Sequence, residues 1–230
     1  QWAEGKIDGK VMSNAFGYIL LAAFGLVSSD DGSAVGTYDH TFTTNNDNES
    51  PTLTIFKSTP NEELAYALSV LNSLEIEIVV GEYVKYSASF ISKKGASVSV
   101  TPAYSIETEH EFTAKHLNLY IGNYGTAFAT IKGTTAYPVK SLKITLERSA
   151  EPYFETGTDT PTEIHNKAFN CSIEVEKRYS DLTFKTLAQG DTKKAVVIEV
   201  VNADQTIGTG GNPALEFDLP KVIVNEHEPS

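Results

Sequence analysis

The sequence predicts a mainly β protein, an antiparallel β-sandwich or barrel with one or two flanking α-helices. Three observations predict this class. Segments in which apolar and polar residues alternate recur along most of the 230 residues, and a period of two is typical of strands with one buried face. Turn residues separate these segments. Only two stretches carry clear helix signals. We therefore expect a single β domain over residues 1–230.

The first strand is expected at Lys6–Val11, and a helix follows it. Ser13 is a suitable N-cap, the helix should run from about Asn14 to Phe24, and Gly25 can end it. The helix is apolar nearly all round, so neighbours must cover it on more than one side. These neighbours are either its own sheet or another subunit.

A polar segment, Ser28–Ser50, separates this helix from a strand expected at Thr52–Lys57. It is rich in Ser, Asp, Asn, Gly and Thr, and its sizeable apolar residues are Val35, Tyr38 and Phe42. Irregular segments of this length inside a compact domain are usually functional or mobile. The sequence therefore predicts a long polar loop, or arm, at about residues 28–50.

A second helix is expected from about Pro60 to Leu71. Thr59 suits the N-cap, Pro60 suits the first helical position, and Glu62 completes a capping box. Apolar residues follow at helical spacing: Leu64, Leu68 and Leu71.

From Leu74 onwards the period becomes two. Leu74, Ile76 and Ile78 alternate with Glu75 and Glu77, which is the pattern of a half-buried strand. A tight turn and a return strand should follow. The turn is expected at 80–83, and a short helix or irregular crossing at 182–188. Strands are expected at 84–92, 96–101, 105–114, 115–121, 141–147, 169–178, 195–201 and 214–224.

Charge and cysteine content exclude several classes of protein. Lys plus Arg is 18 against Asp plus Glu 30, a net charge of -12, so on average the chain repels polyanions. The single cysteine, Cys171, excludes an intrachain disulfide and a Cys-based zinc site. We expect it to be a small buried residue in a strand. The longest apolar stretch, Ala15–Val27, spans only about 20 Å as a helix, so no membrane insertion is expected.

Motifs for enzymatic chemistry are missing. The sequence has no phosphate-binding loop, no dinucleotide fingerprint, no H-E-x-x-H and no G-x-S-x-G. His110 and His116, with Glu109 or Glu111, form one conceivable metal site, but scattered histidines explain them as well. The oxygen-rich run 45–49 lacks the EF-hand pattern. We therefore expect no cofactor, no metal and no catalytic activity.

Glu107, Glu109 and Glu111 fall on one face of the strand expected at 105–114. A glycosidase needs two carboxylates that face each other across a sugar. Carboxylates at i and i+2 point the same way and repel each other. They suit a solvated strand face or the acidic wall of a channel better than a catalytic pair.

Several short motifs occur in a fixed order along nearly the whole chain. They are residues 5–10, 22–25, 40–43, 51–55, 71–76, 90–95, 161–164, 171–175, 179–181 and 219–222. The series includes G-K-I-D-G-K, H-T-F-T and P-T-L-T-I, and it closes on L-P-K-V. In this order the motifs resemble the tail tube proteins of long-tailed, siphovirus-type bacteriophages.

The resemblance implies two orthogonally packed antiparallel sheets flanked by helix. It also implies homohexameric rings whose inner strands close into one β-barrel, and stacking of these rings into a tube through which DNA passes during ejection. The protein would be part of the virion tail, assembled in the host bacterial cytoplasm. Its partners would be its own copies, the tape measure, tail terminator and distal tail proteins, and DNA that passes without tight binding.

Within such a tube, Glu107, Glu109 and Glu111 would line an acidic lumen that repels phosphates. The apolar helix would bury its second face against a neighbour, and the polar arm would reach the adjacent ring. The inter-subunit contacts expected on this basis are Phe16, Leu20, Phe24, Tyr38, Phe42, Asn46 and Asp47.

Two alternatives to a tube protein remain. A β-sandwich binding module of a phage or bacterial surface assembly, either an adhesin or a carbohydrate reader, would need a concave aromatic platform. The 11 Tyr and 11 Phe are mostly spaced as core or strand residues. A hydrolase would need Glu107, Glu109 and Glu111 for turnover.

Overall fold

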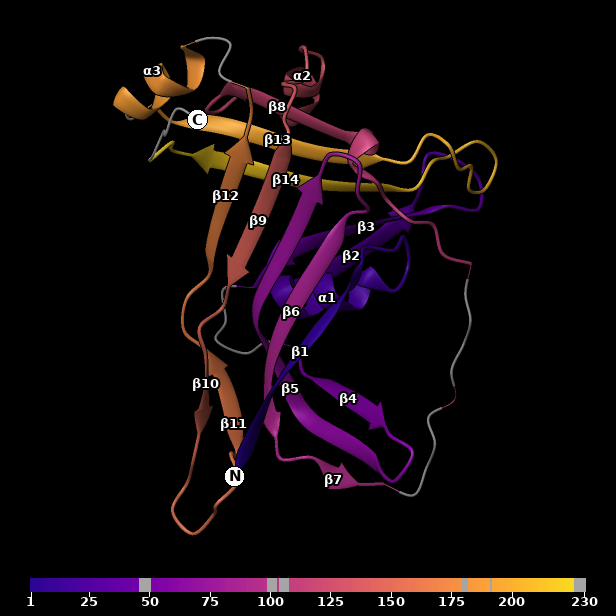
Figure 1. The fold of residues 1–230 in the computed structure, drawn as a ribbon, viewed down its shortest axis with the longest axis vertical. Helices are drawn as coiled ribbons and strands as arrows, with labels where there is room; N and C mark the ends of the chain where they lie inside the picture. The colour runs from indigo at the N-terminus through magenta and orange to yellow at the C-terminus, as the bar shows by residue number, and fades with distance from the viewer. Residues whose placement is uncertain (46–50, 99–102, 104–107, 179–181, 191, 226–230) are drawn as a thin grey trace.

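The computed structural model describes residues 1–45, 51–98, 103, 108–178, 182–190 and 192–225. Its central element is a long strand, β5 (Glu63–Val79) (Figure 1). The second half of β5 pairs with β6 (Lys85–Lys93) on one side and with β9 (Ser141–Glu147) on the other. Beyond these, β1 (Trp2–Lys10) pairs with β6, and β12 (Asn170–Glu176) pairs with β9. The order of this large sheet is thus β1-β6-β5-β9-β12, with every pairing antiparallel.

The first half of β5 leaves the large sheet and pairs with β4 (Leu53–Ser58) and β7 (Ala96–Ser97). The two halves meet near Leu68, whose φ of 53° is unusual for a residue other than glycine. The helix expected at Pro60–Leu71 is therefore wrong. Thr59 and Glu62 do bond to each other, but in the turn from β4 to β5, where the Glu62 amide donates to Thr59 Oγ1 at 3.2 Å. A capping pattern and a tight turn use the same side-chain contact.

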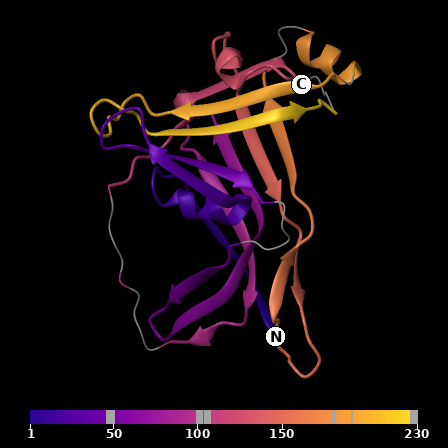
Figure 2. The ribbon, with the colours of Figure 1, turned by 180° about the vertical axis from the view of Figure 1, so that it is seen from behind.

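A second sheet crosses the large one. It consists of β8 (Leu117–Asn123), β13 (Lys194–Val201) and β14 (Ala214–Val222) in the order β14-β13-β8, and its strands run across those of the large sheet (Figures 1 and 2). The expectation of a mainly β, sandwich-like fold is confirmed, and no closed barrel forms within the described part of one chain. The main core side chains between the layers are Leu71, Leu74, Ile76, Phe90, Ile144, Leu146, Val196 and Ile198.

The first helix, α1 (Phe16–Phe24), begins and ends close to where the sequence predicts. It packs against β5 on one side and against a hairpin of β2 (Gly25–Asp31) and β3 (Tyr38–Thr44) on the other. Figure 2 shows α1 and this hairpin in front of the large sheet. The sequence left open whether the chain's own sheet or another subunit covers the helix. Strands of the same chain cover both sides.

The hairpin also corrects the loop expected at Ser28–Ser50. Residues 25–44 form two paired strands joined at 32–37, and residues 46–50 lie outside the described part. The pairing was missed because most of the hairpin is exposed, so it lacks the buried alternate positions by which a strand is recognised.

Shorter elements complete the fold. The hairpin of β10 (Ala150–Tyr153) and β11 (Glu163–Asn166) extends from β9 and β12, and α3 (Thr183–Gln189) matches the short helix expected near 182–188. A 3₁₀ turn at Ala114–His116 precedes β8, and α2 (Phe128–Lys132) follows it. The expected strand at 105–114 is wrong in its described part, since residues 108–113 contain only isolated bridges and Ala114 begins the 3₁₀ turn.

Candidate assembly surfaces

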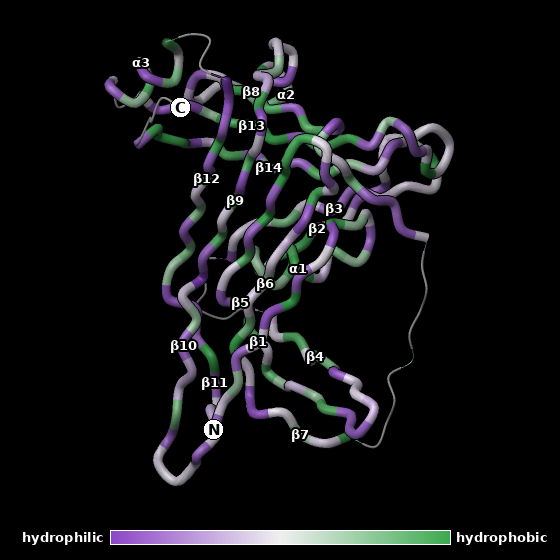
Figure 3. Tube along the Cα trace, in the orientation of Figure 1, coloured by the Kyte–Doolittle hydropathy of each residue, from purple (hydrophilic) through white to green (hydrophobic). Residues whose placement is uncertain are grey.

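One face of the large sheet is polar and faces away from the core. Figure 3 shows hydrophobic and hydrophilic residues alternating along β5 and β9, and the hydrophobic positions point to α1 and the second sheet. We call the opposite side the polar face. Its residues are Glu4, Lys6, Asp8, Lys10, Lys85, Ser87, Ser89, Ser73, Glu75, Glu77, Ser141, Lys143, Thr145, Glu147, Asn170, Ser172, Glu174 and Glu176.

The polar face is acidic and hydrogen-bonded. Seven of its residues are Asp or Glu and four are Lys. Ser73 and Ser89 share a hydrogen bond of 2.7 Å, and Lys143 Nζ lies 3.3 Å from Glu75 Oε1. The Ser87 hydroxyl, and then Lys6, hold the pKa of Asp8 below its ordinary value. The lowered pKa keeps the Asp8 carboxylate ionised at neutral pH.

Among the described elements, only the hairpin β10–β11 covers this side of the sheet, and it does so at one end. There Ile164 of β11 packs with Val70 and Ile91, which are apolar exceptions on that side. The rest of the polar face, from Ser73 and Ser89 onwards, has no helix or strand packed upon it in the described part of the chain.

The large sheet also has two open edges. In the described residues, β1 pairs only with β6 and β12 pairs only with β9. The two edge strands have nine and seven residues. An exposed edge of this length offers a row of unpaired N–H and C=O groups to another chain. The sequence predicts these strands but gives no sign that they are the edges, because pairing order is decided by contacts distant along the chain.

The hairpin β2–β3 forms an arm whose tip rests on the loop between β13 and β14. The Val35 amide donates to Thr209 Oγ1 at 3.1 Å, and the Thr209 amide donates to the Val35 carbonyl at 3.0 Å. Gly208 has φ of 54°, and a Cβ there would collide with the Val35 carbonyl. Glycine is therefore required for this close approach. Val35 and Tyr38 remain 78% and 68% exposed.

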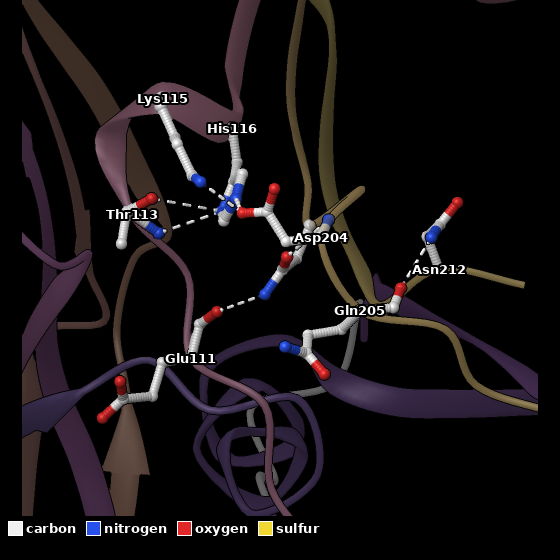
Figure 4. Close-up of polar contacts among 8 residues, drawn as sticks. Glu111, Thr113, Lys115, His116, Asp204, Gln205 and Asn212 are labelled. Carbon is white, nitrogen blue, oxygen red and sulfur yellow. Dashed lines mark hydrogen bonds and ion pairs between the residues drawn. The ribbon is translucent and has the colours of Figure 1, made fainter.

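A buried histidine anchors the base of the same loop (Figure 4). His116 Nδ1 accepts the Thr113 amide at 3.1 Å, and its Nε2 lies 3.1 Å from Asp204 Oδ2. Lys115 also pairs with Asp204, and the pKa of Asp204 is lowered first by Lys115 and then by His116. Asn202 Nδ2 donates to the Glu111 carbonyl at 2.7 Å. The 3₁₀ turn, the loop and the arm are thus linked in series.

The three glutamates predicted to line a lumen are not brought together on a strand. Glu107 lies outside the described residues. Both carboxylate oxygens of Glu109 accept backbone amides before α1, from Asn14 and Ala15, at 2.9 Å each. Glu111 Oε1 pairs with Lys10 Nζ at 2.7 Å. The placement of Glu109 therefore indicates a structural role at the helix start.

Replacing Glu109 with alanine is expected to lower the free energy of unfolding by about 0.5–2 kcal/mol, the usual cost of a lost side-chain cap. Urea unfolding of the purified chain measures it. Glu111→Ala is the matched control and should cost less, because its ion pair with Lys10 is exposed. Equal costs would contradict the capping role.

The residues predicted to contact other subunits fall into three groups. Phe16 and Leu20 are buried in the chain's own core, and Phe24 packs its ring 5.8 Å from Phe169. In the arm, Phe42 packs against this core and Tyr38 is exposed. Asn46 and Asp47 lie outside the described residues. Of the described ones, Tyr38 has the most surface to offer a neighbour.

A cluster of charges lies under α2 on the second sheet. Lys132 Nζ is 2.8 Å from Glu216 Oε2 and 3.6 Å from Glu199 Oε1. Partial burial, together with the negative charge of Glu216, raises the pKa of Asp218 to about 6. The folded chain therefore binds more protons than the unfolded chain between about pH 4 and pH 6, and this group lowers stability as pH rises through that window.

Asp218→Asn is consequently expected to stabilise the chain at pH 7 and to change little near pH 4. The gain should stay below about 1 kcal/mol because solvent screens the pair. Urea unfolding of both proteins at the two pH values measures the difference. A variant that gains as much at pH 4 as at pH 7 would contradict the raised pKa.

Three further expectations from the sequence concern metal binding, Cys171 and membrane insertion. In the described residues, no three His, Cys, Asp or Glu side chains gather closely enough to hold a metal ion. Cys171 lies in a strand, β12, as expected, but its edge position leaves it exposed, contrary to the burial we predicted. Every helix in the described ranges is too short or too polar to span a membrane.

The comparison with protein families shows which family the chain belongs to. A family model described as phage tail tube protein matches residues 1–227. The chain belongs to the phage tail tube protein family. Among curated proteins, none matches. Membership in this family makes the chain a structural protein of the virion tail that assembles with itself and with other tail proteins. The resemblance noted in the sequence is thereby confirmed.

In this tail tube protein, the described part of the chain leaves most of the polar face and the two edges of the large sheet uncovered. Sequence reasoning found the alternation that creates the face, in Glu75 and Glu77 for example, but assigned the acidic lumen to Glu107, Glu109 and Glu111. The missed signal was the repetition of polar positions across several alternating segments, which become one surface only when those segments pair.

Proposed function

We propose that this chain forms homohexameric rings that stack into the tail tube, and that DNA passes through the tube during ejection into the host bacterium. The observation that carries the proposal is the acidic polar face bounded by the open edges of β1 and β12. A ring of copies pairs each edge with the next, so no edge stays exposed.

The polar face suits the inner wall of this ring. The other side of the large sheet carries α1, the arm and the second sheet, and these bulky layers fit only on the wider outer circumference. Water fills the channel, so its wall must be polar. The excess of Asp and Glu on the polar face repels phosphates, which lets DNA move without tight binding.

The arm suits the contact between rings. A head-to-tail contact along the axis that does not close generates an open stack. The exposed Val35 and Tyr38 at the arm's tip, fixed by the loop at Thr209, provide surface for such a contact. At the ends of the stack we expect the tape measure, terminator and distal tail proteins, with assembly in the host cytoplasm.

Electron microscopy of the purified full chain tests the proposal. We expect rings or tubes about 100 Å across with a central channel, an order of magnitude set by six domains of this mass. Tyr38→Glu should reduce stacking while leaving single rings. A protein that stays monomeric at high concentration in virion-like buffer would contradict the proposal.

A further inference from the structure

We propose that neighbouring subunits in the ring meet through a parallel pair of strands, β12 of one copy and β1 of the next. This inference rests on the ring closure proposed above and adds the relative direction of the two strands that meet at each junction. Every pairing inside the large sheet is antiparallel, so the subunit junction would differ in kind from the pairings within the subunit.

The direction follows from the number of strands. Going from β1 through β6, β5 and β9 to β12, the chain direction reverses four times. After an even number of reversals the first and last strands point the same way, and the arrowheads of β1 and β12 in Figure 1 do so. A sheet with four or six strands would give the opposite result.

Rotational symmetry then fixes the junction. A rotation about the tube axis leaves the up or down direction of every strand unchanged. The β1 strand of the next copy therefore points the same way as the β12 strand beside it. Antiparallel pairing of β1 with another β1 would need a two-fold axis, and it would produce a closed dimer instead of a ring.

The two edges lie at the same level of the sheet. Directly paired residues form a row across all five strands on the polar face: Asp8, Ser87, Glu75, Thr145 and Ser172. Even-numbered residues of β1 and of β12 thus share the polar face. The stagger of a closed barrel shifts the junction along the strands, but by an even number of residues, because an odd shift would turn one strand over.

On the core side, the apolar side chains of one edge fit the space at the other. On the core side, Ile173 and Val175 are only half-buried at the edge of β12, while the position of a Cβ on Gly5 in β1 has open space around it. On the polar face, β12 presents Glu174 and Glu176, and β1 presents two carboxylates and two lysines: Glu4, Asp8, Lys6 and Lys10. A second copy would cover the apolar pair, and its β1 edge would bring Lys6 and Lys10, along with two carboxylates, beside the glutamates of β12.

Disulfide trapping tests the direction, because adjacent strands bring Cα atoms within the 4.4–6.8 Å that a disulfide needs. In a Cys171→Ser background, one series combines Ser172→Cys with a cysteine at each even-numbered position of residues 2–10. A second series combines Glu176→Cys with the same five positions. Tubes of each variant are oxidised, and ladders up to hexamer are read on non-reducing gels.

For the parallel junction, the β1 position that links best should move four residues towards the C-terminus when the β12 cysteine moves from 172 to 176. The pair Ser172→Cys with Glu77→Cys is the matched control. Both positions lie on the polar face, but β5 is internal to the sheet, so this pair should give no ladder.

A shift of four residues towards the N-terminus would overturn the parallel junction and leave edge closure standing. Dimers from single β1 cysteines would indicate a two-fold contact and overturn it too. Tubes that form with no link at any pair would overturn the junction together with the edge closure of the proposed function. Failure of every variant and of the parent chain to form particles would overturn the proposed function itself.

Discussion

Proline at an outward-facing position of β12 is expected to abolish tube formation while the chain stays folded. Of two neighbouring residues in β12, Ser172 and Ile173, one has its backbone N–H on the open edge of the sheet, and this is that position. Along an edge strand, successive backbone N–H groups point alternately to the paired strand and to the open edge. Proline removes one N–H. At the position whose N–H faces outwards, the chain loses none of its own hydrogen bonds, but the next subunit loses a donor. Urea unfolding and electron microscopy read the two effects.

The neighbouring proline provides the internal comparison. It removes a hydrogen bond to β9 and should lower the free energy of unfolding measurably, whereas the outward-facing position should stay within about 0.5 kcal/mol. Ser172→Ala and Ile173→Val keep both N–H groups and should assemble normally. If both proline variants formed normal tubes, the edge of β12 would not be an assembly surface.

The largest loss of stability is expected at the centre of the core. Leu74 is 0% exposed and sits in β5 between Ala88 of β6 and Leu146 of β9. Leu74→Ala removes buried methyl groups and leaves a cavity, which typically costs about 2–5 kcal/mol. Small domains are stable by only about 5–15 kcal/mol, so the midpoint of urea unfolding should fall sharply.

The same strand supplies the control. Glu77 lies three residues further along β5 on the polar face and is exposed, so Glu77→Ala should change the free energy of unfolding by no more than about 0.5 kcal/mol. A similar loss for both variants would mean that the two faces of β5 do not differ as described. Circular dichroism in a urea series is sufficient to compare them.

Local patterns predict those parts of the fold in which one face of a strand is buried. The segment 141–147 alternates clearly and 195–201 is an apolar run, and both are strands at those positions or within a residue of them. The segment 60–71 was misjudged because the turn contact of Thr59 with Glu62 imitates a cap. The hairpin in 25–44 was missed because most of its residues are exposed, so hydrophobic periodicity carries no signal there.

Assembly surfaces were harder to predict than strands. The acidic run 107–111 looked like one strand face, yet Glu109 caps the start of α1 from a position distant along the chain. The polar face is built from five strands, and its two edges become visible only once the pairing order is known. The ordered series of short motifs identified the family from the sequence alone, although no single motif in it is specific.

The most direct test of the central claim is a three-dimensional reconstruction, by cryo-electron microscopy, of the particle that the full chain forms. We predict six copies per ring, with Glu75 and Thr145 facing the channel and with β12 of each copy hydrogen-bonded to β1 of the next. A particle whose polar face points outwards, or in which β1 and β12 remain unpaired, would contradict the account.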